Sequence, residues 1–580
     1  MKVSDFIIDF LVKEKVSHIF EVCGGALAHL LDSLHGRKDI ATVSVHHEQA
    51  AAMAAEGYAR ITGDVGVAMA TSGPGATNML TGIASCFFDS IPSVFITGQV
   101  NTYEFKFNRP VRQIGFQETD IVSIAKPIVK DAILISDPSK IKYYLERAFY
   151  LARSGRSGPV LLDIPMNIQR SEIKPGSLLS FVPPTARKKE KSCDQRTIEL
   201  VVRKLRSAVR PLILVGGGVA LSGAREELER FASKSGIPVV SSLMGLDALS
   251  SESGLFSGMI GTYGNRYANL AVASADLLIC LGTRLDTRQT GTNPKTFARH
   301  AVKIHVDIDP NELNNKLKVD FPIQSDIKKF LRDLNEQSGL FNSERISPWR
   351  DKIKGFHDKF PSFVHAADKP IHPNYLIDCL SGFLTPKSIV CADIGQNQIW
   401  AAQSLALKKG SRFLTQGGMG TMGSSLPMAI GASFAAERRP VVVIAGDGGF
   451  QLNIQELQTL FHHRLPVKVI LLNNFCYGMV RQFQEQYFHS RFQSTMVGYS
   501  CPDFVKVAAA YKIPALRIEK NTQINKALKS LFAANGPFFL EIKIPQKTQV
   551  LPKLSVNKPI EDQEPVLTRK VLRSLLSEDR

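Results

Sequence analysis

The chain has 580 residues, 44% of them hydrophobic, which is enough for about three domains with cores of their own. Its formal net charge of +18 is spread along the sequence, and the densest basic run, 187–191, falls in a predicted linker, so we expect no nucleic-acid partner. No apolar run is long enough to cross a bilayer and no signal-peptide pattern precedes the first predicted helix, so we expect a cytoplasmic protein without a membrane partner.

The first predicted block covers 1–172 and carries an acidic residue where a strand gives way to a helix. The β-branched segment 40–45 predicts a strand, and the sequence EQAAAMAAEGYAR at 48–60 has the apolar period of a helix. Glu48 opens this helix, a position where the helix dipole alone also favours a carboxylate. The segment TSGPGATN at 71–78 predicts a tight glycine turn beyond the helix.

The middle block covers 193–335 and follows a linker at 174–192 that contains Pro and Lys residues. Three apolar segments, 210–219, 277–288 and 302–310, predict buried strands with polar residues at their ends. The first of them ends in three consecutive glycines. Such strand ends suit nucleotides, but a single glycine triplet is weak evidence.

The last block covers 370–550 and is followed by a tail at 551–580. It closes on a strand led by Gly-Pro at 536–543, as the first block does at 158–165, which indicates two copies of one plan. Together the three blocks predict an α/β protein with three doubly wound parallel-sheet domains.

Two strand ends in the last block predict a cation site. The apolar run 441–445 is followed by Gly446 and Asp447. The next apolar run along the chain, 467–472, is followed by Asn473 and Asn474. Because neighbouring parallel strands end at one edge of a sheet, we expect the carboxylate and the amide to lie close together. Oxygen ligands suit Mg²⁺ that bridges phosphates, and the glycines after Asp447 offer N–H groups to an anion. An ordinary βαβ unit with a tight turn is the alternative.

The spacing from Gly446-Asp447-Gly448 to Asn473-Asn474 resembles that of enzymes that use thiamine diphosphate, also called thiamine pyrophosphate. Nearly the whole chain resembles the catalytic subunit of acetohydroxyacid (acetolactate) synthase. The resemblance implies a pyrimidine-binding domain at 1–172, a central domain at 193–335 and a pyrophosphate-binding domain at 370–550. It also implies an active site between two subunits, hence a homodimer or homotetramer, and leaves open a small regulatory subunit.

The resemblance implies thiamine diphosphate and Mg²⁺ and assigns residues to both. Glu48 would contact the pyrimidine ring, Met422 would bend the coenzyme, and the Gly420 carbonyl would accept from its amino group. The assigned residues are Glu48, Gln117, Gly420 and Met422 for catalysis, with Gln117 at the substrate; Gly25, Gln396, Asn397, Met422, Gly448 and Gly449 for the coenzyme; and Asp447, Asn474 and the Cys476 carbonyl for the metal.

The central block resembles a flavin-binding domain, which implies FAD, with an empty or ADP-filled site as the alternative. FAD would be structural because the implied reaction involves no net redox change. The residues matched to it are Arg156, Gly216, Gly217, Gly261, Tyr263, Arg284, Asp307 and Asp326.

Several departures from the family pattern bear on the substrate. Met166 stands where the family has Lys, Phe483 where it has Trp and Asn397 where it has His, and the segment 101–115 contains an insertion with Lys106, Arg109 and Arg112. Three functions therefore stay open. The first is acetolactate synthesis, in which pyruvate is decarboxylated and its remaining two-carbon unit is transferred to a second pyruvate. The second is a related carboligase with another acceptor, such as a nucleotide-linked ketosugar. The third is a non-catalytic paralogue that acts as a partner subunit.

Overall fold

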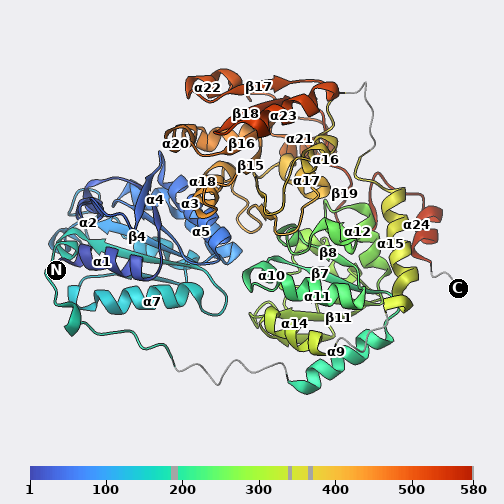
Figure 1. Cartoon of the computed structure of the whole chain (residues 1–580), viewed down its shortest axis with the longest axis horizontal. Helices are drawn as coiled ribbons and strands as arrows, with labels where there is room; N and C mark the ends of the chain where they lie inside the picture. Colours follow the sequence, from blue (N-terminus) through green and yellow to red (C-terminus); the bar gives the residue numbers. More distant parts are fainter. Residues whose placement is uncertain (185–193, 338–342, 364–369, 578–580) are drawn as a thin grey trace.

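The computed structural model describes residues 1–184, 194–337, 343–363 and 370–577. The basic run 187–191 and the predicted start of the central domain at residue 193 lie outside these described residues. Three six-stranded parallel sheets, each flanked by helices, account for most of the fold (Figure 1). The predicted class, α/β with three doubly wound sheets, is therefore confirmed. Among the described residues, no helix is long and apolar enough to span a membrane.

The first sheet has the strand order β2-β1-β3-β4-β6-β5. Its strands are β1 (His18–Val22), β2 (Ala41–Ser44), β3 (Gly66–Ala70), β4 (Ser93–Gln99), β5 (Asp131–Leu134) and β6 (Pro159–Pro165). One face packs on α1 (Val3–Lys13), α2 (Ala28–Leu34) and α7 (Ile141–Arg153), and the other on α3 (Glu48–Thr62) and α5 (Leu80–Asp89). Both faces are apolar because the helices cover both sides of a parallel sheet.

The third sheet repeats this order as β14-β13-β15-β16-β18-β17, which supports the predicted duplication. Its strands are β13 (Ile389–Ala392), β14 (Arg412–Leu414), β15 (Val441–Gly446), β16 (Val467–Asn473), β17 (Ala515–Ile518) and β18 (Phe538–Lys543). Helices α16 (Pro373–Ser381), α17 (Gln396–Ser404) and α23 (Ile524–Ala533) cover one face, and α18 (Ser425–Ala435), α20 (Leu457–His463) and α22 (Phe504–Ala510) cover the other.

The middle sheet has a different order, β12-β11-β10-β7-β8-β9. Its strands are β7 (Pro211–Val215), β8 (Val239–Ser241), β9 (Phe256–Met259), β10 (Leu277–Leu281), β11 (Val302–Asp307) and β12 (Phe321–Gln324). Counted within the domain, this is the order 3-2-1-4-5-6 of dinucleotide-binding folds, which places a crevice between β7 and β10. Its helices are α9 (Gln195–Ser207), α10 (Gly217–Leu221), α11 (Arg225–Ser235) and α14 (Ile327–Glu336) on one face, and α12 (Arg266–Ser274) and α15 (Ser347–Lys359) on the other.

The C-terminal tail returns to the middle domain. Strands β19 (Lys553–Leu554) and β20 (Gln563–Glu564) pair antiparallel, and α24 (Arg569–Leu576) lies on the α12 and α15 side (Figure 1). The Leu554 N–H donates to the Thr262 carbonyl at 2.7 Å, and Arg266 donates to the Gln563 and Pro565 carbonyls at 3.1 and 2.7 Å. The tail is therefore part of the core on this side.

Helices α3 and α18 join the first and third domains by close contact of their backbones. A Cβ atom built on Gly57 of α3 would lie 2.1 Å from the Met428 carbonyl oxygen, and one on Gly431 of α18 would lie 1.8 Å from that of Ala54. Because Gly57 meets Met428 while Ala54 meets Gly431, the two helices run antiparallel. A single hydrophobic cluster extends across this contact from the first sheet to the third.

We expect Gly431→Ala to destabilise the protein, because the new methyl group would overlap the Ala54 carbonyl and force the helices apart. Overpacking of this kind costs about 1–3 kcal/mol, occasionally more. The midpoint of thermal unfolding, measured by calorimetry, should fall by several degrees. Gly355→Ala, at an exposed position of α15, is the matched control, since no heavy atom lies within 4 Å of its added Cβ. An unchanged midpoint for Gly431→Ala would show that the contact is not tight.

Candidate active site

The carboxyl ends of β13, β15 and β16 bring the predicted metal-binding residues together. β15 pairs in parallel with both β13 and β16, so Asp447 after β15 and Asn474 after β16 lie at one edge, as the sequence predicts. In the third sheet β14 lies on one side of β13 and β15 lies on the other, so the strand order reverses at β13. The carboxyl ends of β13 and β15 therefore form a topological switch point. Asp447 is 1% exposed and Asn474 is 5% exposed, so both polar groups need partners.

Three oxygen atoms of Asp447, Asn474 and Cys476 lie close together there. Asn474 Nδ2 donates to Gln396 Oε1 at 3.0 Å, while Gln396 Nε2 is already used for Gln482 and Thr548, which orients the Asn474 amide. Asn474 Oδ1 then lies 3.1 Å from Asp447 Oδ1 and 2.9 Å from the Cys476 carbonyl oxygen. A cation at the centre would remove this repulsion. The donor set of a carboxylate, an amide and a carbonyl fits the predicted Mg²⁺.

The second oxygen of Asp447 has a different partner. Its Oδ2 accepts from the Tyr499 hydroxyl at 2.6 Å. Burial raises the pKa of Asp447 to about 6, although this hydrogen bond opposes the shift. Gly448 lies against the ring of Tyr477, where an added Cβ would be 2.4 Å from a ring carbon. Gly448 and Gly449 lie in the first turn of the short helix α19 (Asp447–Phe450), the predicted anion cradle.

Gln396 and Asn397 start α17 beside this cluster, but their amide nitrogens have protein acceptors. Asn397 Nδ2 donates to the carbonyls of Asp393 and Ile444 at 2.7 and 3.2 Å. The side chain of Asn397 therefore ties β13 to β15. Contact of Gln396 and Asn397 with the coenzyme phosphates therefore remains untested.

Buried Asp393 holds the loop that carries Gly420 and Met422. Asp393 Oδ1 accepts from the Gly423 N–H at 2.9 Å, and its Oδ2 accepts from the N–H and hydroxyl of Ser425 at 3.1 and 2.7 Å. Burial raises the pKa of Asp393, and these bonds oppose the shift. A role for Asp393 was not predicted. Its place directly after a β-branched strand was the available signal.

The first domain holds the other end of this loop. Asp89 accepts from the N–H groups of Gly417 and Gly418 at 3.0 and 2.8 Å, and Gln416 Nε2 donates to Glu56 at 2.8 Å. Arg60 bridges Glu56 and Asp89 at 2.7 and 2.8 Å. Burial raises the pKa of Glu56, although Arg60 opposes the shift. This network was not predicted.

Glu48 lies at the carboxyl edge of the first sheet, half-buried at the start of α3. Its Oε2 accepts from Asn78 Nδ2 at 2.9 Å, and an added Cβ on Gly75 would lie 3.3 Å from its Oε1. Gln117 has a left-handed backbone with φ 64° and packs against Gly73 of the same turn. Gly25 follows β1, next to Gly24, whose added Cβ would lie 2.4 Å from Thr71. The predicted coenzyme and substrate residues Gly25, Glu48 and Gln117 thus share one edge.

The structure does not bring Glu48 and Met422 of one chain together. Because α3 and α18 are antiparallel, Glu48 lies beyond one end of their contact and the Met422 loop beyond the other. Six residues separate Glu48 from Ala54, which adds about 9 Å along the helix axis. Gly420 and Met419 of the loop are exposed.

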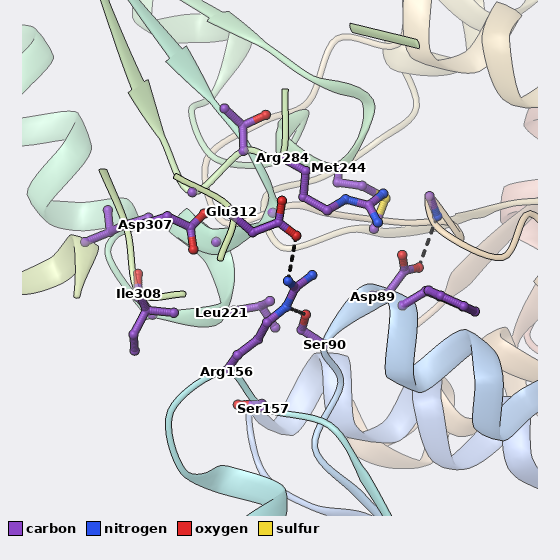
Figure 2. A pocket seen from close by; sticks show the side chains of 18 of the residues that line it. Asp89, Ser90, Arg156, Ser157, Leu221, Met244, Arg284, Asp307, Ile308 and Glu312 are labelled. Atoms are coloured by element: carbon purple, nitrogen blue, oxygen red, sulfur yellow. Dashed lines mark hydrogen bonds and ion pairs between the residues drawn. The ribbon is translucent and has the colours of Figure 1, made fainter. Parts of the chain in front are cut away.

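A pocket of about 640 Å³ lies where the three domains meet (Figure 2). That volume is in the range of small-molecule sites. Glycines after β7 and β10 line it at the crevice expected from the strand order, and Phe88, Asp89 and Gly417 close the side toward the other two domains. The predicted flavin residues on its wall are Arg156, Gly217, Arg284, Asp307 and Asp326.

The remaining predicted flavin residues are placed differently. Gly216 ends β7 next to the pocket, and an added Cβ there would lie 2.2 Å from the Gly282 carbonyl. Gly261 and Tyr263 are not among the described residues that line the pocket; they follow the edge strand β9. The Tyr263 carbonyl accepts from Gln403 of the third domain at 2.9 Å.

Arg156 crosses the pocket from the first domain to the middle one. Its Nη1 lies 2.8 Å from Glu312 and 3.2 Å from Asp309, and its Nε donates to Ser90 at 2.8 Å (Figure 2). Nearby, burial raises the pKa of Asp307 to about 6. The pocket thus presents both cationic and acidic groups, as a ligand with phosphates and ribose hydroxyls requires.

The insertion in 101–115 forms a loop whose base is held by buried Glu118. Its two carboxylate oxygens accept from the Lys106 N–H at 2.7 Å and the Ile114 N–H at 2.6 Å. The residues between them are exposed, including Arg109 and Arg112. Gln117 follows the loop in the sequence and packs against Gly73 at the sheet edge that carries Glu48. The loop therefore lies beside the predicted site.

The departures at Met166 and Phe483 lie directly after a strand and within a helix, respectively. Met166 starts α8 (Met166–Gln169) directly after β6. Phe483 is exposed on α21 (Gly478–Tyr487), with its ring centroid 4.7 Å from that of Tyr487.

Comparison with known proteins agrees with this geometry. Models of thiamine pyrophosphate enzymes match the chain in three parts: the N-terminal TPP binding domain at 1–124, the central domain at 198–334 and the C-terminal TPP binding domain at 393–542. The chain is 36% identical over 562 residues to the acetolactate synthase large subunit of Cyanidium caldarium, covering 95% of this chain and 94% of that protein. It is 38% identical over 575 residues to acetolactate synthase 1, chloroplastic, of Zea mays, with 95% and 87% covered. It is 37% identical over 569 residues to the probable acetolactate synthase large subunit of Methanococcus aeolicus, with 94% and 92% covered. The chain therefore belongs to the thiamine pyrophosphate enzymes, in the branch that contains the acetolactate synthase large subunits.

Proposed function

We propose that the protein is a carboligase that decarboxylates a 2-keto acid, pyruvate, and transfers the remaining two-carbon unit to a second carbonyl. The observation that carries the proposal is the cluster of Asp447, Asn474 and Cys476 oxygens, because it provides a cation site at the strand ends of a thiamine pyrophosphate enzyme domain. Acetolactate synthases that match 95% of the chain support the same reaction type.

When bound, thiamine diphosphate supplies a nucleophilic carbon and an electron sink for decarboxylation. The chain's own residues would hold and orient it. The oxygen cluster would hold Mg²⁺ against the diphosphate, and the N–H groups of Gly448 and Gly449 would bind its oxygens. Met422 would pack against the bent coenzyme, since a thioether fills irregular gaps beside rings. Glu48 would hold a proton against the pyrimidine ring.

The active site requires a second copy of the chain in this proposal. Glu48 and the Met422 loop lie beyond opposite ends of the α3–α18 contact, which supports a coenzyme held between two chains. A symmetric dimer would supply Glu48 from one copy and Met422, Asp447 and Asn474 from the other, and it would contain two equal sites.

We expect Glu48→Gln to lower turnover of pyruvate at least about 100-fold while coenzyme binding persists, because it removes only a proton-holding group. Asp447→Ala should lose both turnover and Mg²⁺-dependent coenzyme binding. Neither variant alone should be active. When the two are unfolded together and refolded as a mixture, about one quarter of the wild-type activity should return, since one site of each mixed dimer is intact.

The complementation result distinguishes the two arrangements. Each variant refolded alone is the control. If the mixture stays inactive although mixed dimers form, Glu48 and Asp447 act within one chain. Wild-type protein that binds no thiamine diphosphate in the presence of Mg²⁺ would instead contradict the whole proposal and favour a non-catalytic partner subunit.

We also propose that FAD occupies the pocket between the three domains. The strand order of the middle sheet, the glycines at its crevice and the ring of Arg156, Arg284 and Asp307 around the pocket support this. A carboligation needs no redox cofactor, so the flavin would act by joining the domains.

We expect Gly217→Leu to abolish flavin binding, because the new side chain would extend from the start of α10 into the pocket, beside Met244. Flavin absorbance and fluorescence of the protein after incubation with FAD and gel filtration measure the effect. Gly176→Leu, at an exposed turn with no heavy atom within 4 Å of the added Cβ, is the control. Wild-type protein without a flavin band would contradict the FAD proposal. Retention of flavin by Gly217→Leu would show that the flavin binds outside this pocket.

A second candidate concerns the acceptor. The exposed loop between Lys106 and Ile114 carries two arginines beside the Glu48 edge, which would favour an acceptor with phosphate groups, such as a nucleotide-linked ketosugar. Met166 and Phe483 replace the Lys and Trp of the family pattern. Pyruvate as the acceptor remains the first candidate because the full-length relatives are acetolactate synthases.

Products formed from labelled pyruvate distinguish the acceptors. Incubation of the enzyme, thiamine diphosphate, Mg²⁺ and FAD with pyruvate alone should give labelled acetolactate, detected by mass spectrometry. If label enters product only when a nucleotide-linked ketosugar is added, the second candidate is correct. In that case Arg109→Ala with Arg112→Ala should raise KM for the ketosugar and leave decarboxylation of pyruvate unchanged.

A further inference from the structure

The two oxygens of the Asp447 carboxylate have separate roles in the structure. Oδ1 faces the cluster with Asn474 Oδ1 and the Cys476 carbonyl, at 3.1 Å from the amide oxygen. Oδ2 accepts from the Tyr499 hydroxyl at 2.6 Å. This is the distance of a hydrogen bond from a hydroxyl to a charged oxygen. A hydroxyl 52 positions along the chain thus engages the same carboxylate that the cation site uses.

Tyr499 is held in place by its own surroundings. Its ring meets that of Tyr477 edge-on, with centroids 4.7 Å apart, and Tyr477 in turn packs on Gly448 of the anion cradle. The Tyr477 N–H donates to the Thr495 carbonyl at 3.2 Å, and the Thr495 hydroxyl donates to Gln484 of α21 at 2.5 Å. The hydroxyl of Tyr499 therefore approaches Asp447 from a fixed segment.

We propose that Tyr499 is a positioning residue of the cation site: its hydroxyl fixes the Asp447 carboxylate so that Oδ1 faces the metal. This inference rests on the proposed function. A carboxylate with one anchored oxygen has already lost its rotation, so the cation does not have to order it. Partners of metal ligands act in this way, and their loss typically lowers metal affinity about 10–100-fold.

The position of the Tyr499 hydroxyl argues against direct binding to the metal. The hydroxyl contacts the oxygen that lies outside the cluster, so it is not itself placed as a fourth metal ligand. It also differs from Tyr477, whose hydroxyl has no hydrogen-bond partner among the described residues and whose ring alone covers Gly448. Substitution of each tyrosine by Phe therefore distinguishes the effect of the Tyr499 hydrogen bond from the effect of removing a hydroxyl that has no partner in the described part of the chain.

The test is Tyr499→Phe, which removes one oxygen atom and keeps the ring. Calorimetric titrations of thiamine diphosphate at a series of Mg²⁺ concentrations give the Mg²⁺ concentration for half-maximal coenzyme binding. We expect this concentration to rise about 10–100-fold in Tyr499→Phe. Coenzyme affinity at saturating Mg²⁺ and the thermal midpoint of the protein without coenzyme should stay close to wild type.

Tyr477→Phe is the matched control and should leave the Mg²⁺ dependence unchanged. The inference is overturned if Tyr499→Phe keeps the wild-type Mg²⁺ dependence, or if Tyr477→Phe shifts it equally, which would assign the effect to packing. It is also overturned if coenzyme affinity falls equally at all Mg²⁺ concentrations. Failure of the wild type to bind the coenzyme with Mg²⁺ would be a different result, since it contradicts the proposed function itself.

Discussion

The contact between α3 and α18 is the constraint on which the arrangement of this protein depends. Gly57 and Gly431 let two backbones meet at a distance that a methyl group would prevent, and one hydrophobic core then runs through two domains. The same contact orients the carboxyl edges of both sheets. It sets Glu48 and the Met422 loop at opposite ends, so the separation of these two predicted site residues follows from the packing of two glycines.

The geometry of the glycine-rich loop that carries Met422, and of the pocket, depends on the same packing. Asp89 is the last residue of α5 in the first domain. It accepts hydrogen bonds from two successive N–H groups of the glycine-rich loop in the third domain. Asp89 and Gly417 also form one wall of the pocket, with Met244 of the middle domain beside them (Figure 2). Burial makes such polar groups costly unless they are paired, so the bonds across the domain boundary fix its geometry.

The sequence predicted the features that depend on local pattern. Asp447 and Asn474 were paired correctly because strands that alternate with helices form parallel neighbours, whose ends share an edge. Asp393, Asp89 and Tyr499 were not predicted, because each acts on a partner brought close only by the tertiary fold; Asp89 and Gly417 are 328 positions apart. Gly261 and Tyr263 were matched to a ligand by resemblance, whereas the strand they follow lies at the sheet edge.

The return of the C-terminal tail to the middle domain has a mechanical consequence. The third domain is attached to the middle one by the chain that enters it before α16 and again by the chain that leaves it after β18 and pairs with Thr262. A domain on one covalent connection can rotate about it, whereas two connections at separate points resist rotation. Rotation of the third domain against the middle one should therefore be restricted.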